Sequence, residues 1–283
     1  MGNGNLIQYV YKSRPNIGGL MYAWFQAMFT RVDLLIYGSL GENYMKQIIE
    51  IIYREVLRLE GLGNYYDADS ELARLNRSAF RAPQIVSREL YDILAFCIDS
   101  YDKTGGCFDV TIQSEGYKLG NIEYIKLFPD RYAVGFMQPG ISIDLSGLLK
   151  GYALDKIRDI LLCHGIVNAL VNMGNSSILA LGHAPFEEAW SVGFNNDFPS
   201  FQQKVKSLLL RDECLTTSGN SSAGRKHIIS PFTGQFIKGK KGVAVITLNG
   251  AVGEVLSTAL FVADAEQRKR IVGDFSPRFV MDS

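Results

Sequence analysis

The sequence predicts an α+β fold, with mixed or antiparallel sheets flanked by helices, in one domain over residues 1–283. Segments with the 3.6-residue apolar period of helices are interleaved with short apolar runs that are typical of strands. Several of these runs are separated by tight turns, which favours hairpins over a doubly wound parallel sheet. No Pro- or Ser-rich linker divides the chain.

Apolar periodicity and capping residues predict the helices. Ser70 or Asp69 is expected to cap a short helix, and Ser87 a long one that Gly105-Gly106 ends. The predicted helices cover residues 42–60, 70–76, 87–104 and 146–164, and a last helix contains residues 253–260.

Runs of alternating or continuously apolar residues predict the strands. The last of them is closed by Asn249-Gly250 and leads into the final helix. Residues 227–234 are expected to form a short strand entering a turn that Pro231 and Gly234 shape. The other predicted strands cover residues 24–37 (with an alternating section at 31–36), 132–136, 140–145, 167–173, 178–181, 190–194, 208–215 and 243–248.

Composition excludes some classes of function. The 283 residues include 29 basic and 29 acidic side chains, and this balance argues against a nucleic-acid surface. No stretch approaches the ~18 apolar residues of a membrane span. The first residues carry no basic segment or cleavage pattern of a signal peptide, so a cytoplasmic location is expected. None of the four cysteines forms a C-x-x-C pair, which indicates buried free thiols.

The last strand and helix place an acid and a hydroxyl on one face. Glu254 and Thr258 are four residues apart and close to the helix start. A carboxylate and a hydroxyl are hard oxygen ligands of the kind that Mg²⁺ accepts. The alternative is a surface Glu that favours a helix N-terminus and a Thr that only packs.

Residues 143–153 join a strand end, a Ser-Gly turn and a helix start. The free N–H groups of such a junction attract phosphate, and Lys150, one turn into the helix, adds a positive charge. The alternative is an exposed lysine on a surface helix.

Three further side chains lie in turns or short strands. Asp109 follows a glycine turn and could accept hydrogen bonds from an adenine or ribose, or merely stabilise its turn. Ser218, in a Thr-Thr-Ser-Gly run, suits a phosphate or flavin edge, or a plain polar loop. His227 could act as a general base, although a lone strand histidine is more often structural.

The order of these stretches along the chain resembles the ApbE family, the FAD:protein FMN transferases. The resemblance spans roughly residues 25–263. It rests on the blocks Ala27-Met-Phe-Thr30, Tyr66-Asp-Ala-Asp-Ser-Glu-Leu-Ala-Arg-Leu-Asn76, Gly105-Gly-Cys-Phe-Asp-Val-Thr111, Asp144-Leu-Ser-Gly-Leu-Leu-Lys-Gly-Tyr-Ala153, Val171-Asn-Met-Gly174, Thr217-Ser-Gly219, His227-Ile-Ile-Ser-Pro-Phe-Thr-Gly234 and Glu254-Val-Leu-Ser-Thr-Ala-Leu-Phe261.

The resemblance implies one α+β domain with an FAD cleft. It also implies a Mg²⁺-dependent transfer of FMN from FAD to a threonine of a client flavoprotein, with release of AMP. His227 and Lys150 would assist the reaction. Glu254, Thr258 and a backbone carbonyl near Leu149 would hold the metal. The FAD site would include Met28, Tyr66, Phe108, Asp109, Lys150, Ser218 and His227.

Four positions depart from the family pattern. Glu254 stands where the family usually has Asp, and Asn or Ser replaces an acid in Gly174-Asn-Ser176, Ser218-Gly-Asn220 and His227-Ile-Ile-Ser-Pro231. Loss of negative charge weakens metal binding. A second hypothesis therefore stays open, a divergent relative that binds FAD or another nucleotide without transferring FMN. Members of the family are often exported, and no export signal is seen here.

Overall fold

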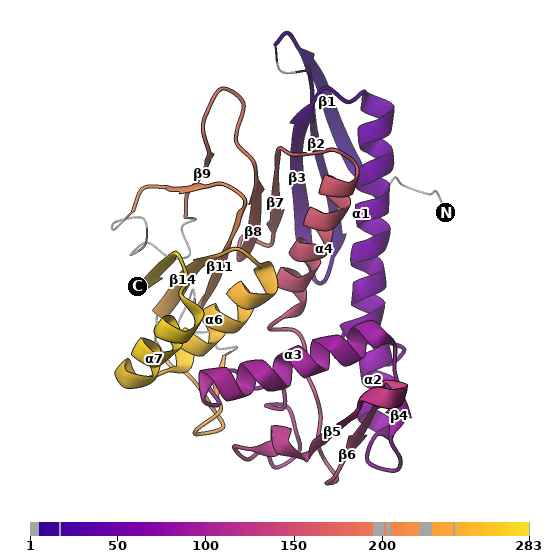
Figure 1. Ribbon diagram of the computed structural model, residues 1–283, viewed down its shortest axis with the longest axis vertical. Coiled ribbons are helices and arrows are strands. Elements are labelled where there is room, and N and C mark those ends of the chain that lie inside the picture. Colours follow the sequence, from indigo (N-terminus) through magenta and orange to yellow (C-terminus); the bar gives the residue numbers. More distant parts are fainter. Residues whose placement is uncertain are drawn as a thin grey trace.

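The computed structural model describes residues 6–16, 18–194, 201, 205–220, 228–239 and 241–282. Its main feature is an eight-stranded sheet in which every neighbouring pair is antiparallel (Figure 1). In spatial order the strands are β1 (Gln8–Arg14), β2 (Gly18–Ala27), β3 (Thr30–Gly38), β7 (Ala169–Met173), β8 (Ser177–Leu181), β11 (Glu213–Asn220), β14 (Lys241–Thr247) and β15 (Phe279–Asp282).

Helices cover one face of this sheet. Inward residues of β2 such as Met21 and Phe25 alternate with half-exposed ones, as the two-residue period of a strand requires. They pack against the apolar stripe of α1 and against α4. The helices are α1 (Glu42–Gly63), α2 (Glu71–Ser78), α3 (Arg88–Thr104), α4 (Leu149–Cys163), α6 (Gly250–Val262) and α7 (Ala265–Phe275), with the 3₁₀ turns η1 (Asn121–Tyr124) and η2 (Pro129–Arg131).

Three smaller strand groups complete the architecture. A sheet of β4 (Gln84–Ile85), β6 (Ala133–Phe136) and β5 (Ile125–Phe128) shares a core with α3, α6 and α7. The pair β9 (Trp190–Val192) and β10 (Leu208–Leu210) packs on the other face of the large sheet. The pair β12 (Ile229–Ser230) and β13 (Gln235–Phe236) forms a short hairpin.

The capping predictions are confirmed. Ser70 accepts a hydrogen bond from Ala73 N at 3.0 Å, and Ser87 accepts one from Leu90 N at 3.2 Å. Gly105 and Gly106 end α3 with φ of +59° and +79°. The four cysteines are free, although Cys163 is exposed rather than buried.

The predicted strand over residues 140–145 is wrong. Its backbone bonds side chains and loops instead of a neighbouring strand. The N–H and C=O of Ile143 bind the Asn76 amide at 2.9 and 2.8 Å, and Ser142 N donates to Ser114 Oγ at 2.9 Å. The predicted strand over residues 208–215 is two strands, because Asp212, at φ +56°, turns the chain between β10 and β11. Within the described ranges, no helix is both long and apolar enough to cross a membrane.

Candidate active site

A cleft of about 1140 Å³ lies where the start of α4, the end of β11 and the first turns of α6 meet the loop after α3. Several residues that the sequence singled out are brought together in its wall: Tyr66, Phe108, Asp109, Lys150, Ser218, Glu254 and Thr258.

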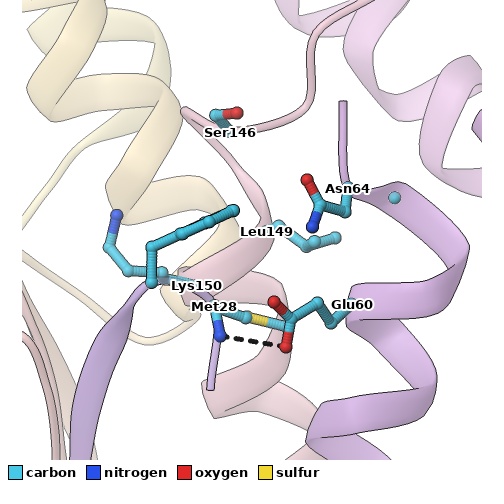
Figure 2. A pocket seen from close by; sticks show the side chains of 8 residues that line it. Met28, Glu60, Asn64, Ser146, Leu149 and Lys150 are labelled. Atoms are coloured by element: carbon cyan, nitrogen blue, oxygen red, sulfur yellow. Dashed lines mark hydrogen bonds between the residues drawn. The ribbon is translucent and has the colours of Figure 1, made fainter. Parts of the chain in front are cut away.

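A smaller cavity of about 400 Å³ adjoins the cleft and shares Ser146 and Lys150 with it (Figure 2). The predicted residues Met28 and Leu149 line this second cavity. Leu149 is the first residue of α4, and its side chain packs against Gly63 of α1. The predicted site therefore occupies two connected hollows that meet at Lys150.

Glu254 is the buried acid of the site. Only 4% of it is exposed, and its Oε1 accepts a hydrogen bond from Ser177 Oγ at 2.5 Å. Burial raises the pKa of this carboxyl, while Lys150, the Ser177 hydroxyl and the N–H of Gly151 act in the opposite direction. The carboxylate is thus held by groups from α4 and β8, with one cation beside it.

Hydroxyl groups surround the first turns of α6. Ser218 Oγ lies 2.8 Å from Ser257 Oγ and 3.3 Å from Thr258 Oγ1. Thr216 Oγ1 is buried and has no hydrogen-bond partner among the described residues. Of these hydroxyls, those of Ser218 and Thr258 line the cleft together with the Glu254 carboxylate.

The start of α4 opens on the cleft. Leu148 precedes the helix and provides no side-chain cap, and Ser146, Gly147 and Lys150 line the cavity. The Gly151 N–H faces the Glu254 carboxylate instead of the carbonyl of Gly147. In the described part of the chain, no backbone N–H donates to that carbonyl. The junction combines the N–H groups of Gly147 and Lys150, which have no partner among the described residues, with the lysine side chain and an available carbonyl oxygen.

Asp109 bonds mainly to its own loop. Its Oδ1 accepts from Thr111 N at 2.7 Å and from Thr111 Oγ1 at 2.6 Å, and its Oδ2 accepts from the Tyr117 hydroxyl at 2.7 Å. These bonds stabilise the loop, which is one of the two roles that the sequence left open for Asp109. The side chain still borders the cleft, beside the buried Phe108.

A two-residue turn carries Met28 into the smaller cavity. Met28 and Phe29 join β2 to β3 with φ of +51° and +57°, the left-handed pair of a type I′ turn. Glu60 Oε2 accepts the N–H of Met28 at 3.1 Å (Figure 2). Phe29 lies edge-on to Tyr66, with ring centroids 6.1 Å apart. Contacts from α1 and Tyr66 therefore help to hold this turn at the cleft.

His227 lies outside the described residues. The residues that follow it, Ile228, Ile229 and Pro231, line the cleft.

Sequence reasoning missed Ser177, Asp144 and Glu60. Ser177 belongs to a polar turn that the sequence showed, but nothing in the pattern pairs it with Glu254, 77 residues away. Asp144 lies in a quoted block and borders the cleft, where its Oδ1 accepts from Ser146 N at 2.8 Å. Glu60 is one of many acids on an amphipathic helix, and only the fold brings it to Met28.

Known proteins share this fold and sequence pattern. The model of the ApbE family matches residues 28–116 and 114–279. A FAD:protein FMN transferase of Treponema pallidum (strain Nichols) is 27% identical over 249 residues, which cover 73% of this chain and 68% of the relative. A protein of the same name from Klebsiella pneumoniae (strain 342) is 24% identical over 245 residues, 76% of this chain and 75% of the relative.

Two solved structures are similar over nearly the whole chain. The flavin transferase ApbE from Vibrio cholerae has a TM-score of 0.76 at 21% identity and covers 97% of this chain and 93% of that one. The apo form of the Pseudomonas stutzeri flavinyl transferase ApbE has a TM-score of 0.80 at 16% identity and covers 95% and 94%. At these identities the likeness establishes the α+β fold that the sequence predicts.

Proposed function

This chain belongs to the ApbE family, and on that premise we propose that it is a flavin transferase that moves FMN from FAD to a client protein. The observation that carries the proposal is the cleft itself. It gathers Lys150, the uncapped start of α4 and the Glu254–Thr258 face of α6 in one cavity. Cationic and N–H groups beside a carboxylate and hydroxyls suit a pyrophosphate with a bound cation.

The pyrophosphate of FAD is proposed to lie at the start of α4. There the free N–H groups and Lys150 would oppose its negative charge. Tyr66 and Phe108 would supply apolar ring surface to the flavin or the adenine, and Ser218 would supply a hydroxyl. Met28 would contact the ligand from the smaller cavity, which meets the cleft at Lys150.

The donor set fits Mg²⁺. Glu254 and Thr258 provide a carboxylate and a hydroxyl, and of the carbonyls near Leu149, that of Gly147 has no backbone donor among the described residues. No cluster of three or more His, Cys, Asp or Glu occurs in the part of the chain described, so substrate oxygens and water would complete the coordination. When bound, the metal would neutralise charge that develops on the pyrophosphate.

The acceptor is proposed to be a threonine hydroxyl of the client. Its oxygen forms a bond to the phosphorus of the FMN half, the anhydride bond to AMP breaks, and the hydroxyl proton passes to a base. His227 is proposed as that base, since the residues immediately after it line the cleft. Lys150 would stabilise the charge on the transferred phosphate.

A second candidate is FAD binding without transfer. Two of the altered positions have structural partners: Ser176 Oγ lies 3.3 Å from Ser177 Oγ, and Asn220 Nδ2 donates to Ile237 O at 2.8 Å. A carboxylate at 220 could not donate that bond. These contacts favour a structural role for the altered residues around the site. Glu254 remains as the acid beside Thr258.

The two functions are separated by incubating the protein with FAD, Mg²⁺ and a threonine-bearing client, then measuring intact mass and AMP. Transfer adds the mass of FMN minus water to the client. Glu254→Ala is expected to abolish the addition, whereas Glu50→Gln, an exposed acid on α1, leaves it intact. FAD binding with no mass gain on any client would favour the second candidate.

A further inference from the structure

Helix α6, which carries Glu254 and Thr258, takes its cap from another helix. The first N–H groups of a helix have no partner within it, and Asn249, which precedes α6, makes no side-chain cap. Instead, the N–H of Gly250 donates to Asp155 Oδ1 at 2.7 Å, and that of Ala251 donates to Oδ2 at 2.9 Å. Asp155 belongs to α4, so both oxygens of one carboxylate tie the two helices together.

The two helices touch through glycine backbone at the same place. A Cβ on Gly151 would lie 2.2 Å from the Gly250 carbonyl oxygen, and a Cβ on Gly250 would lie 2.3 Å from that of Gly151. Gly151 and Asp155 are four residues apart on α4, and Gly250 and Glu254 are four apart on α6, so each pair shares a face. The cap and the glycine contact therefore meet α6 at the same residue, Gly250, and lie one turn apart on α4.

The N–H groups at the start of α6 are the closest partners of the Asp155 carboxylate. Arg158 Nη1 is 3.7 Å from Oδ1, and the same guanidinium donates to Cys214 Sγ at 3.3 Å. Burial raises the pKa of Asp155, and the two N–H groups of α6 and Arg158 oppose that rise, while Asp159 adds to it. The short bonds are those to the helix start.

We propose that Asp155 is a positioning residue of the active site, which binds the first turn of α6 from α4 and so fixes Glu254 and Thr258 relative to Lys150. This inference rests on the function proposed above. Loss of the cap frees the α6 start to move away from Gly151, whose N–H faces the Glu254 carboxylate. The metal ligands then lose their alignment with the pyrophosphate site, although Asp155 itself touches neither ligand.

Three variants test this role. Asp155→Ala removes the cap, Asp155→Asn keeps one acceptor oxygen, and Asp159→Asn is a matched control at an exposed position of the same helix. The amide hydrogen-exchange rates of the protein without FAD or Mg²⁺ measure how well the cap stabilises the start of α6. Asp155→Ala should speed exchange over residues 250–254 and leave α7 unchanged, with Asp155→Asn intermediate and Asp159→Asn like the wild type. Wild-type exchange at 250–254 in Asp155→Ala would overturn the inference.

The metal requirement is the second readout. For Asp155→Ala, the Mg²⁺ concentration giving half of the maximal transfer rate should rise about 10- to 100-fold, the usual effect of losing a group that supports a metal ligand. FAD affinity without Mg²⁺ should stay at the wild-type value, and Asp155→Asn should recover part of the loss. An unchanged Mg²⁺ requirement in an active Asp155→Ala protein refutes the positioning role. A wild type that transfers no FMN refutes the proposed function instead, while the exchange measurement still tests the cap.

Discussion

At the residue scale, the site centres on one carboxylate in an unusual environment. Glu254 is almost completely buried and is held by the Ser177 hydroxyl and the Gly151 N–H. Burial of a charged group costs free energy unless partners compensate it, and such groups are found preferentially at functional sites. This residue should therefore cost stability in the empty protein, while in the proposed function it would hold the metal.

The first prediction concerns the pH dependence of that cost. Burial raises the pKa of Glu254 above the ordinary 4.5, so the folded state holds a proton that the unfolded state releases. The stabilisation from this proton is present below pH 4.5 and is lost as the pH rises through the folded pKa. Urea unfolding without Mg²⁺ should thus show wild type losing stability relative to Glu254→Gln across this window. A difference in unfolding free energy between the two proteins that does not vary with pH would contradict the raised pKa of Glu254.

The second prediction concerns Lys150. Lys150→Ala should weaken FAD binding by about 10- to 100-fold, since a hydrogen bond to a charged group contributes about 1.5–3 kcal/mol. Lys156→Ala is the matched control, because Lys156 is on the same helix but pairs with Glu89, at 3.4 Å. Titration of FAD by flavin fluorescence measures both. Equal losses in the two variants would place the phosphate elsewhere.

The site residues could be predicted from the sequence where they lie in a short motif. Lys150, Ser218, Glu254 and Thr258 lie in blocks whose order resembles the family, and the fold brings them to one cleft. Partners distant in sequence could not be predicted, because Ser177 and Asp155 meet α6 only through packing. Asp109 was ambiguous for the same reason: its hydrogen bond to Tyr117 depends on the path of the loop.

At the element scale, the crossing of α4 and α6 depends on two glycines. Backbone contact at Gly151 and Gly250 lets the helices approach more closely than side chains would permit. Long helices with clear apolar periodicity, such as α1 and α3, were predictable to within a few residues. Strand β1 and helix α7 were not, because short or half-exposed elements carry weak periodicity and take their structure from neighbours. The single strand predicted over residues 24–37 is wrong, because Met28 and Phe29 turn the chain between β2 and β3.

The third prediction compares two helical glycines. Gly61→Ala should raise the free energy of unfolding by about 0.5–1 kcal/mol, because a Cβ there meets open space and alanine favours helix. Gly151→Ala should lower it by about 1–3 kcal/mol despite the same gain in propensity, since the Cβ meets Gly250 and Glu254. Chemical denaturation of both variants decides the matter. Two stabilised proteins would rule out the tight crossing.

At the scale of the whole molecule, the cleft joins parts that are far apart in the chain. The loop after α3, the start of α4, the end of β11 and the first turns of α6 all contribute to it. The order of short motifs could predict this assembly only through resemblance to a family, because no local pattern reveals which loops meet. The eight-stranded sheet supplies part of the physical reason, since β11 belongs to it, α6 packs on β11 and β14, and α4 packs on β8.

The fourth prediction follows from that shared construction. In the proposed function FAD with Mg²⁺ would contact several elements at once and bind the folded state, so it should raise the melting temperature as its concentration rises. Chelation of Mg²⁺ should remove part of the rise in wild type and little of it in Glu254→Ala. Melting curves with FAD alone, with FAD and Mg²⁺, and with added chelator measure the effect. A rise independent of Mg²⁺ in both proteins would remove the metal role from Glu254.

The most direct test of the account is the intact mass of a threonine-bearing client after incubation with the protein, FAD and Mg²⁺. The account predicts a gain equal to FMN minus water, an equal amount of AMP, and loss of both when Glu254 is replaced by Ala. FAD bound in the cleft with neither product, for clients that a known flavin transferase modifies under the same conditions, would contradict it.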